Sequence, residues 1–231
     1  MINVSSSGDA QRAERIGGTT VSAIMGRNPW QTREKALQYH LNPAPLKDNR
    51  YMEWGRRLEG PVAEAYADKN DVTLIDLVEE EANGLLCGHT IRHPEVPYLI
   101  GSPDRLVLKP GLTRYKVTEK ISDDLMKIGG GIAYGLEIKT SSAWKAKDWN
   151  DTIPEHYLIQ AQFYMMVTGL DRWDFAVLIG GNGYRDPWHN GDEKGEYSHF
   201  SVKADLMLHQ DMIDAAADFW EEVQSERGRR K

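Results

Sequence analysis

The clearest periodic pattern of apolar residues along the chain runs over residues 49–70. Trp54, Leu58, Val62, Ala65 and Tyr66 recur there at a spacing that places them on one face of a helix. We therefore predict a helix with a buried stripe of these five side chains. Helical spacing and flanking Pro, Asn and Gly residues predict further helices at 21–25, 32–41, 155–167 and 204–227. A threonine of the preceding turn, or Ser22 itself, is expected to cap the first of these.

Short segments rich in apolar and β-branched residues lie between these helices. They predict strands at 72–78, 85–93, 99–109, 134–140, 173–179 and 200–202. The order of elements indicates an α/β protein with a central mixed β-sheet flanked by helices. The segment 110–133 contains four glycines and separates two strands that would otherwise form a hairpin. We predict that it is an inserted loop, partly ordered or with a short helix of its own.

Composition narrows the class of protein. A chain of 231 residues with 40% hydrophobic residues suits a single domain, residues 1–231, with a sizeable core. We expect no membrane span, because there is no run of about 18 apolar residues, and no signal peptide, because the N-terminus is polar. Cys87 is the only cysteine, which excludes an internal disulfide and a four-cysteine iron–sulfur cluster and fits a cytoplasmic protein.

The net charge of −7 argues weakly against a nucleic-acid partner. It does not exclude one, because carboxylates gathered in a metal site are neutralised when the metal binds. The basic C-terminal tail contains Arg227, Arg229, Arg230 and Lys231. A solvated end of the chain is the favoured interpretation of this tail, with a nucleic-acid contact as the alternative.

The strongest candidate chemistry lies in the predicted strand 134–140. Side chains alternate between the faces of a strand, so Glu137 and Lys139 share one face while Leu136 and Ile138 point to the other. Asp104 follows a proline on the preceding strand and can lie beside Glu137 if the two strands pair. Two adjacent carboxylates repel each other, and a divalent cation such as magnesium or manganese relieves that repulsion.

A lysine beside such a pair can orient a water or stabilise a phosphate in its transition state. Asp104, Glu137 and Lys139 together therefore fit hydrolysis of a phosphodiester by metal-activated water. Glu59 lies next to the apolar stripe of helix 49–70, where an acid is costly unless it is paired or binds metal. The alternative is that Glu137 and Lys139 form an exposed ion pair on an edge strand.

Two other groups of residues allow weaker hypotheses. Cys87, His89 and His93 suggest zinc, but a fourth ligand is not evident and structural roles are favoured. Tryptophans can stack on nucleic-acid bases. Trp54 is expected in the core because it belongs to the apolar stripe. For Trp144 and Trp149, which lie among lysines beyond the candidate strand, packing and DNA contact remain equally open.

An ordered set of motifs resembles a known family. Over about residues 15–180, the chain is similar to the lambda-exonuclease-type viral recombinase family of the PD-(D/E)XK nuclease superfamily, whose restriction-endonuclease-like fold it is then expected to share. The matching segments are Arg15-Ile16-Gly17-Gly18-Thr19-Thr20-x-Ser22, Trp54-Gly55 with Leu58-Glu59, Gly101-Ser102-Pro103-Asp104, Leu136-Glu137-Ile138-Lys139, and Ile153-Pro154 through Gln160-x-Gln162. The segment 110–133 departs from the compact members of the family.

The resemblance implies a role for each matching residue. Lys139 resembles the catalytic lysine, and Gln160 a residue that orients the substrate or the site. Met52 matches a position where the family places a side chain that separates the DNA strands, although packing in the core is an equal alternative. The implied metal ligands are Asp104, Glu137, the main-chain carbonyl of Ile138, and Glu59. The implied ligands of a terminal 5′ phosphate are Arg15, Ser22 and Ser102.

The resemblance also implies an activity. It predicts a magnesium-dependent exonuclease, with two ions per site and manganese as a substitute, that digests double-stranded DNA from a phosphorylated 5′ end. Mononucleotides and a 3′ single strand would be the products. It further implies a homotrimeric ring and a partner that anneals single strands in bacteriophage recombination within a bacterial host cell. An endonuclease of the same superfamily and a catalytically inactive DNA-binding protein are the alternatives.

Overall fold

A five-stranded mixed sheet forms the centre of the protein. The computed structural model describes residues 12–44, 49–75, 78–79, 87–88, 90–112, 119–122, 125–127, 131–180 and 196–230. The strand order is β1-β6-β9-β10-β11, with β9 and β10 parallel and the other neighbours antiparallel. The strands are β1 (Leu74–Ile75), β6 (Arg105–Leu108), β9 (Ile132–Ser142), β10 (Arg172–Gly180) and β11 (Glu196–Lys203). The predicted α/β class and mixed central sheet are confirmed.

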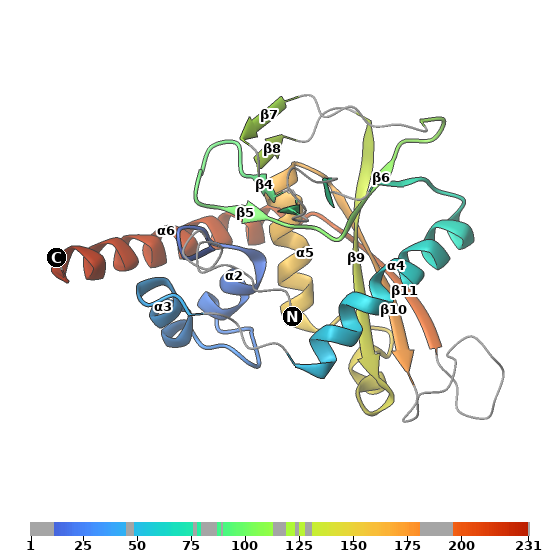
Figure 1. Ribbon diagram of the computed structural model, residues 1–231, viewed down its shortest axis with the longest axis horizontal. Coiled ribbons are helices and arrows are strands. Elements are labelled where there is room, and N and C mark those ends of the chain that lie inside the picture. The colour runs from blue at the N-terminus through green and yellow to red at the C-terminus, as the bar shows by residue number, and fades with distance from the viewer. Residues whose placement is uncertain are drawn as a thin grey trace.

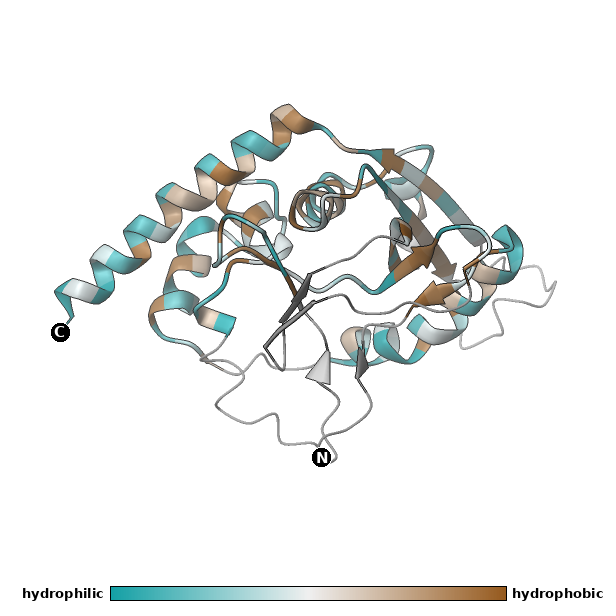
Figure 2. Cartoon of the chain, turned by 90° about the horizontal axis from the view of Figure 1, so that it is seen from above, coloured by the Kyte–Doolittle hydropathy of each residue, from teal (hydrophilic) through white to brown (hydrophobic). Residues whose placement is uncertain are grey.

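Helices cover both faces of this sheet (Figure 1). Helix α4 (Arg50–Asn70) packs on one face, and α5 (Glu155–Thr168) packs on the opposite face. Helices α2 (Gly18–Ile24) and α6 (Leu206–Arg229) contact α5, and α3 (Arg33–Leu41) packs on both of them. The C-terminal end of α6 projects from the body of the molecule (Figures 1 and 2). No described helix is both long and apolar enough to cross a membrane.

The alternation of side chains along β9 and β10 divides the hydrophobic core into two layers. Leu136, Ile138, Ala176 and Leu178 face α4, whereas the alternate residues of β10 pack toward α5. Figure 2 shows the apolar strands between their helical layers. Gly135 is required at its position, because a Cβ atom there would lie only 2.2 Å from the Trp173 ring. That close approach lets the largest core side chain pack directly on β9.

A second sheet, ordered β5-β4-β8-β7, lies outside the central one. It is formed by β4 (Thr90–Arg92), β5 (Ile100–Gly101), β7 (Glu119–Ser122) and β8 (Leu125–Lys127). Two stretches of the predicted insertion 110–133 are therefore strands, β7 and β8, which pair with each other, and β8 also pairs with β4. A short pair is formed by β2 (Val78–Glu79) and β3 (Cys87–Gly88). The predicted strand 99–109 is interrupted between β5 and β6.

Two predictions about the helices were wrong. The first helix begins at Gly18, with Gly17 as its N-cap and no side-chain cap, so Thr19, Thr20 and Ser22 lie inside the helix and none of them caps it. Trp54 is 44% exposed and is not part of the core. Helix α4 has 21 residues, and its apolar stripe is buried at Val62 and Tyr66 but not in the first turns.

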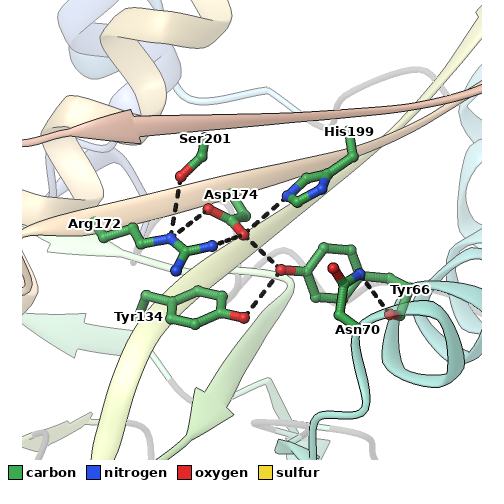
Figure 3. A network of polar contacts seen from close by, with 7 residues as sticks. All are labelled: Tyr66, Asn70, Tyr134, Arg172, Asp174, His199 and Ser201. Atoms are coloured by element: carbon green, nitrogen blue, oxygen red, sulfur yellow. Dashed lines mark hydrogen bonds and ion pairs between the residues drawn. The ribbon is translucent and has the colours of Figure 1, made fainter.

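A network of buried hydrogen bonds and ion pairs connects α4 to the central sheet (Figure 3). The fully buried Asp174 of β10 accepts hydrogen bonds from the Tyr66 hydroxyl of α4 at 2.6 Å and from Arg172 at 2.6 and 2.8 Å. His199 of β11 contacts the same carboxylate at 3.0 Å. Burial by itself would raise the pKa of Asp174, but these donors outweigh burial and lower it. The charged carboxylate thereby holds together three elements that are distant in sequence.

We predict that Asp174→Asn lowers the free energy of unfolding by about 2–3 kcal/mol, because charge-assisted hydrogen bonds are lost inside the protein. Tyr66→Phe should cost less, about 1–2 kcal/mol. The lowered pKa means that this stabilisation is present above the ordinary value of 3.8 and is lost as pH falls below it. Urea unfolding at pH 7 and pH 3 measures both effects. Equal differences at the two pH values would contradict the assigned charge.

Candidate active site

The candidate site lies where β6 and β9 separate. Their pairing ends at Arg105 and Leu136, and Asp104 immediately precedes β6. Strand β9 continues to Ser142, so the N–H of Ile138 extends beyond the paired region. This N–H donates to the Asp104 carboxylate at 2.7 Å. The Asp104 side chain thus takes the place of the next main-chain acceptor in the β6–β9 pairing. We call this position, formed by Asp104, Glu137 and Ile138, the β6–β9 fork.

The same geometry places a main-chain carbonyl at the β6–β9 fork. In a strand that pairs in the antiparallel manner, the N–H and the C=O of one residue point toward the same neighbour. The N–H of Ile138 points toward Asp104, so its C=O points to the same side. Asp104 and the Ile138 carbonyl are two of the predicted metal-binding groups, and the fold brings them together at the β6–β9 fork.

Glu137 and Lys139 point from β9 toward the face covered by α5. β9 is a central strand of the sheet, and at these two positions it pairs with β10 through Glu137–Phe175 and Lys139–Val177. Glu137 is only 1% exposed, and its Oε1 accepts a hydrogen bond from the Lys139 ammonium. Its Oε2 is buried and has no hydrogen-bond partner among the described residues. The alternative of an exposed pair on an edge strand is therefore wrong.

Burial and charge shift the pKa values of this pair strongly. Burial, together with the nearby charge of Asp104, raises the pKa of Glu137 to about 8, although Lys139 acts in the opposite direction. Burial alone would lower the pKa of Lys139, but Glu137 and Asp104 outweigh it and raise that pKa. Lys139 therefore stays protonated, and its ammonium is a positive charge beside the buried acid.

Glu59 reaches the same site from α4. Its carboxylate forms an ion pair with Arg105 at 2.7 Å, and its charge contributes to the raised pKa of Glu137. Arg105 also donates to the main-chain carbonyl of Asp104 at 2.5 Å. Arg105 thus links the helix-borne acid to the strand-borne acid. Sequence analysis did not identify Arg105, because an arginine after an acid is too common to indicate a site.

Gln160 of α5 contacts Tyr164, which lies next to the site. Its amide donates to the Tyr164 hydroxyl at 2.8 Å, and Tyr164 is buried close enough to Asp104 and Glu137 to interact with them electrostatically. Burial first, and then those two charges, raise the pKa of Tyr164. A Cβ on Gly18 would lie 3.1 Å from the Gln160 side chain, so Gly18 allows α2 to approach this part of α5 closely.

The first turn of α5 adds aromatic residues that sequence analysis did not assign to the site. The Lys139 ammonium lies 4.9 Å from the centre of the Tyr157 ring. His156 lies beside Tyr157 and contacts Trp30, which follows α2 in the chain. Burial, with the charges of Lys139 and Lys145, lowers the pKa of His156 to about 4. His156 is therefore neutral at physiological pH.

The residues matched to a 5′-phosphate pocket are only partly brought together. Ile16 pairs with Leu99 and accepts from the N–H of Ile100, so Arg15 lies beside the segment that leads into the exposed Ser102. Ser102 is in turn two residues from Asp104. Met52 is half-buried in the first turn of α4, on the same helix as Glu59.

Ser22 lies inside α2 and forms hydrogen bonds with residues close to it in sequence. It is 1% exposed, its hydroxyl donates to the Thr19 carbonyl at 2.9 Å, and it accepts from the Asn28 amide at 3.0 Å. The Ser22 hydroxyl therefore both donates and accepts a hydrogen bond within this segment. A direct role of Ser22 toward a phosphate remains a proposal that requires these bonds to rearrange.

The weaker candidates have structural explanations where they are described. His93 accepts from the main-chain N–H groups of Glu95 and Val96, both at 3.1 Å, which is a turn contact. Trp149 is buried and stacks on Tyr157, so it packs in the core. The side chains of Cys87, His89 and Trp144 lie outside the described residues.

The donor set of the β6–β9 fork fits a hard divalent cation. Within the described parts of the chain, no three acidic, histidine or cysteine side chains are grouped closely enough to hold a metal by themselves. The fork instead combines two carboxylates with a main-chain carbonyl, and oxygen donors of this kind suit magnesium and manganese. The buried, unpartnered Oε2 of Glu137 is the atom whose position is otherwise unexplained.

Comparison with known proteins assigns the family. The model of the YqaJ-like viral recombinase domain matches residues 9–171. The chain belongs to the YqaJ-like viral recombinase family. The uncharacterized protein YqaJ of Bacillus subtilis (strain 168) is 27% identical to this recombinase-family chain over 208 residues, which are 88% of the chain and 54% of that protein. The chain thus spans about half the length of this relative.

Solved structures of exonucleases share the fold of this member of the YqaJ-like family. The alkaline exonuclease LHK-Exo of Laribacter hongkongensis has a TM-score of 0.67 at 17% identity, over 97% of this chain and 95% of that one. LHK-Exo in complex with dAMP gives 0.68 with the same identity and coverage. A phage-related exonuclease of Haemophilus somnus 129PT gives 0.54 at 13% identity, over 92% and 96%. The family model thus assigns the family, and these exonuclease structures show that the chain shares their fold.

The raised pKa of Glu137 gives a test of the site without any substrate. Between its ordinary value of 4.5 and about 8, the unfolded chain releases a proton that the folded protein retains. The folded state without metal therefore loses stability as pH rises through this window. Glu137→Gln does not titrate, so its stability relative to wild type should rise by on the order of 2 kcal/mol between pH 5 and pH 8. Thermal melts in EDTA measure this difference.

Glu53→Gln is the matched control, because Glu53 is an exposed acid of α4 paired with Arg57. Its stability relative to wild type should stay constant over the same pH range. A constant difference for Glu137→Gln as well would mean that Glu137 is not held in the environment described here.

Proposed function

We propose that this protein is a magnesium-dependent 5′-to-3′ exonuclease on double-stranded DNA. The observation that carries the proposal is the β6–β9 fork, where Asp104 lies close enough to the buried Glu137 to raise its pKa and Lys139 donates to Glu137. The exonucleases that share the fold support the choice of reaction. Release of mononucleotides and a 3′ single strand would suit recombination by strand annealing.

Each residue of the fork has a defined part in this proposal. Asp104, Glu137 and the Ile138 carbonyl would hold magnesium, with Glu59 binding a second ion or its water. When bound, the metal supplies Lewis acidity that activates water and stabilises charge on phosphoryl oxygens. Lys139 remains protonated, so its ammonium orients the water or stabilises the negative charge that develops on the phosphate. Gln160 orients the substrate from α5.

The function is tested with two DNA substrates. A linear duplex with labelled, phosphorylated 5′ ends and a covalently closed circle are each incubated with and without magnesium. The exonuclease should release labelled mononucleotides from the linear duplex only, and only with magnesium. Cleavage of the circle would identify an endonuclease, and binding without cleavage of either substrate would identify a DNA-binding protein that has lost catalysis.

Loss of either carboxylate should abolish hydrolysis while the fold survives. Asp104→Ala and Glu137→Ala each remove a group that we propose holds metal, and in EDTA each should be at least as stable as wild type because repulsion is relieved. Calcium should raise the melting temperature of wild type without supporting turnover. An equal rise in Asp104→Ala would exclude a site at Asp104, and a large loss of stability in EDTA would make the acids structural.

Arg15 is proposed to recognise the terminal 5′ phosphate. It lies beside the segment that leads to Ser102 and Asp104, and a guanidinium makes planar, charge-assisted hydrogen bonds to phosphate. Ser102 is exposed next to Asp104 and would contribute a hydroxyl, with Ser22 contributing after rearrangement. Met52, in the first turn of α4, is proposed as the apolar side chain that separates the strands.

We expect Arg15→Ala to lower the rate on phosphorylated ends by about one to two orders of magnitude, since such a bond contributes roughly 1.5–3 kcal/mol. The rate on hydroxyl ends should change little. The comparison uses one fixed salt concentration, because phosphate contacts depend on salt. Arg15→Lys keeps the charge but not the planar geometry and should recover only part of the preference. An unchanged preference for phosphorylated ends in Arg15→Ala would remove Arg15 from this role.

Two further properties are proposed from the family resemblance. A homotrimeric ring around the DNA would explain processive digestion by a chain with a net charge of −7. A single-strand annealing protein would then bind the 3′ strand. Light scattering of the purified protein distinguishes a trimer from a monomer.

A further inference from the structure

Trp30 is a large exposed side chain next to the candidate active site. It is 56% exposed, and its ring lies 4.6 Å from His156 and 6.4 Å from Tyr157, measured between ring centres. Tyr157 in turn lies under the Lys139 ammonium. One aromatic ring therefore separates Trp30 from the catalytic lysine of the proposed mechanism.

A single exposed tryptophan requires no explanation by itself, but Trp30 is also held in place. The Asn28 side-chain oxygen accepts from the main-chain N–H groups of Trp30 and Gln31 at 2.9 and 3.1 Å. Arg27 pairs with Glu155 at 3.3 Å, which ties this loop to the start of α5. These contacts fix the main chain around Trp30 while its ring stays accessible, and a surface that binds a ligand needs both properties.

The surroundings of the ring favour a negatively charged partner with flat groups. The Lys145 ammonium lies 5.2 Å from the centre of the Trp30 ring, and Lys145 is itself exposed. The neighbouring His156 is neutral at physiological pH, and its buried Nε2 has no hydrogen-bond partner among the described residues. A ring for stacking beside a cation is the combination by which proteins bind unpaired nucleic-acid strands.

We infer that Trp30 is the stacking surface for an unpaired base of the DNA strand whose phosphate lies at the β6–β9 fork. Lys145 would contact a phosphate of the same strand. This inference rests on the proposed function, because it assumes that a DNA strand enters the site. It gives the site a contact with a base in addition to its contacts with phosphates, and such stacking tolerates any base sequence because every base has a flat face.

The test compares Trp30→Ala and Trp30→Phe on duplexes whose 5′-terminal strand has a single abasic nucleotide at one of its first three positions. Binding is measured in calcium. Trp30→Ala should weaken binding of intact DNA by about 10-fold or more, as loss of stacking on one base does, while Trp30→Phe should lose less because it keeps a ring. At one of the three abasic positions, wild type and Trp30→Ala should bind equally.

The pattern across positions separates stacking from other roles. If Trp30→Ala weakens the binding of all three abasic duplexes by the same factor relative to wild type, Trp30 does not stack on any of these bases and the inference is wrong. Unchanged binding of intact DNA by Trp30→Ala would also overturn it. Thermal melts without DNA should leave Trp30→Ala within about 1 °C of wild type, since the ring is exposed. Absence of magnesium-dependent hydrolysis by wild type refutes the proposed function alone, since the binding measurement needs no catalysis.

Discussion

The site depends on the position of β9 inside the sheet. A residue of β9 directs its side chain to one face, and its main-chain groups alternate between the two neighbouring strands. Glu137 and Lys139 therefore point to the α5 face and bond through their main chains to β10, whereas Ile138 offers its main chain to the side of β6. Because β6 ends its pairing at Arg105, that side is open to Asp104. For this reason the Asp104 carboxylate, the Ile138 carbonyl and the buried Glu137 side chain are brought to the same position.

The rest of the fold stabilises an arrangement that is unfavourable by itself. Burying Glu137 near Asp104 raises its pKa, which is an electrostatic cost that the folded protein carries without metal. The Asp174 network holds α4, and with it Glu59, on one face of the sheet. On the other face, Gly135 lets Trp173 pack directly against β9. Both layers restrict movement of the strand that carries the site.

Most of this architecture could be predicted from the sequence, because hydrophobic periodicity reports burial directly. The helices α3, α5 and α6 and the central strands β9 and β10 lie close to the ranges predicted for them. The proximity of Asp104 and Glu137 was predicted on the condition that their strands pair, and β6 does pair with β9. Periodicity could not show which turns of α4 other elements cover, and the burial of Trp54 was wrongly predicted for that reason.

What the sequence could not supply were contacts between distant segments. The Arg105–Glu59 ion pair and the Trp30–His156 contact join elements whose separation along the chain gives no sequence signal. The hydrogen bond from Asn28 to Ser22 likewise could not be predicted from the sequence. The strands in 110–133 depend on pairing with each other and with β4, which local propensity does not report.

The most direct test of the central claim is anomalous diffraction from crystals of the protein grown with manganese. The account predicts a peak at the β6–β9 fork, bound by carboxylate oxygens of Asp104 and Glu137 and by the Ile138 carbonyl. A well-occupied peak elsewhere, with the fork empty at saturating manganese, would contradict it.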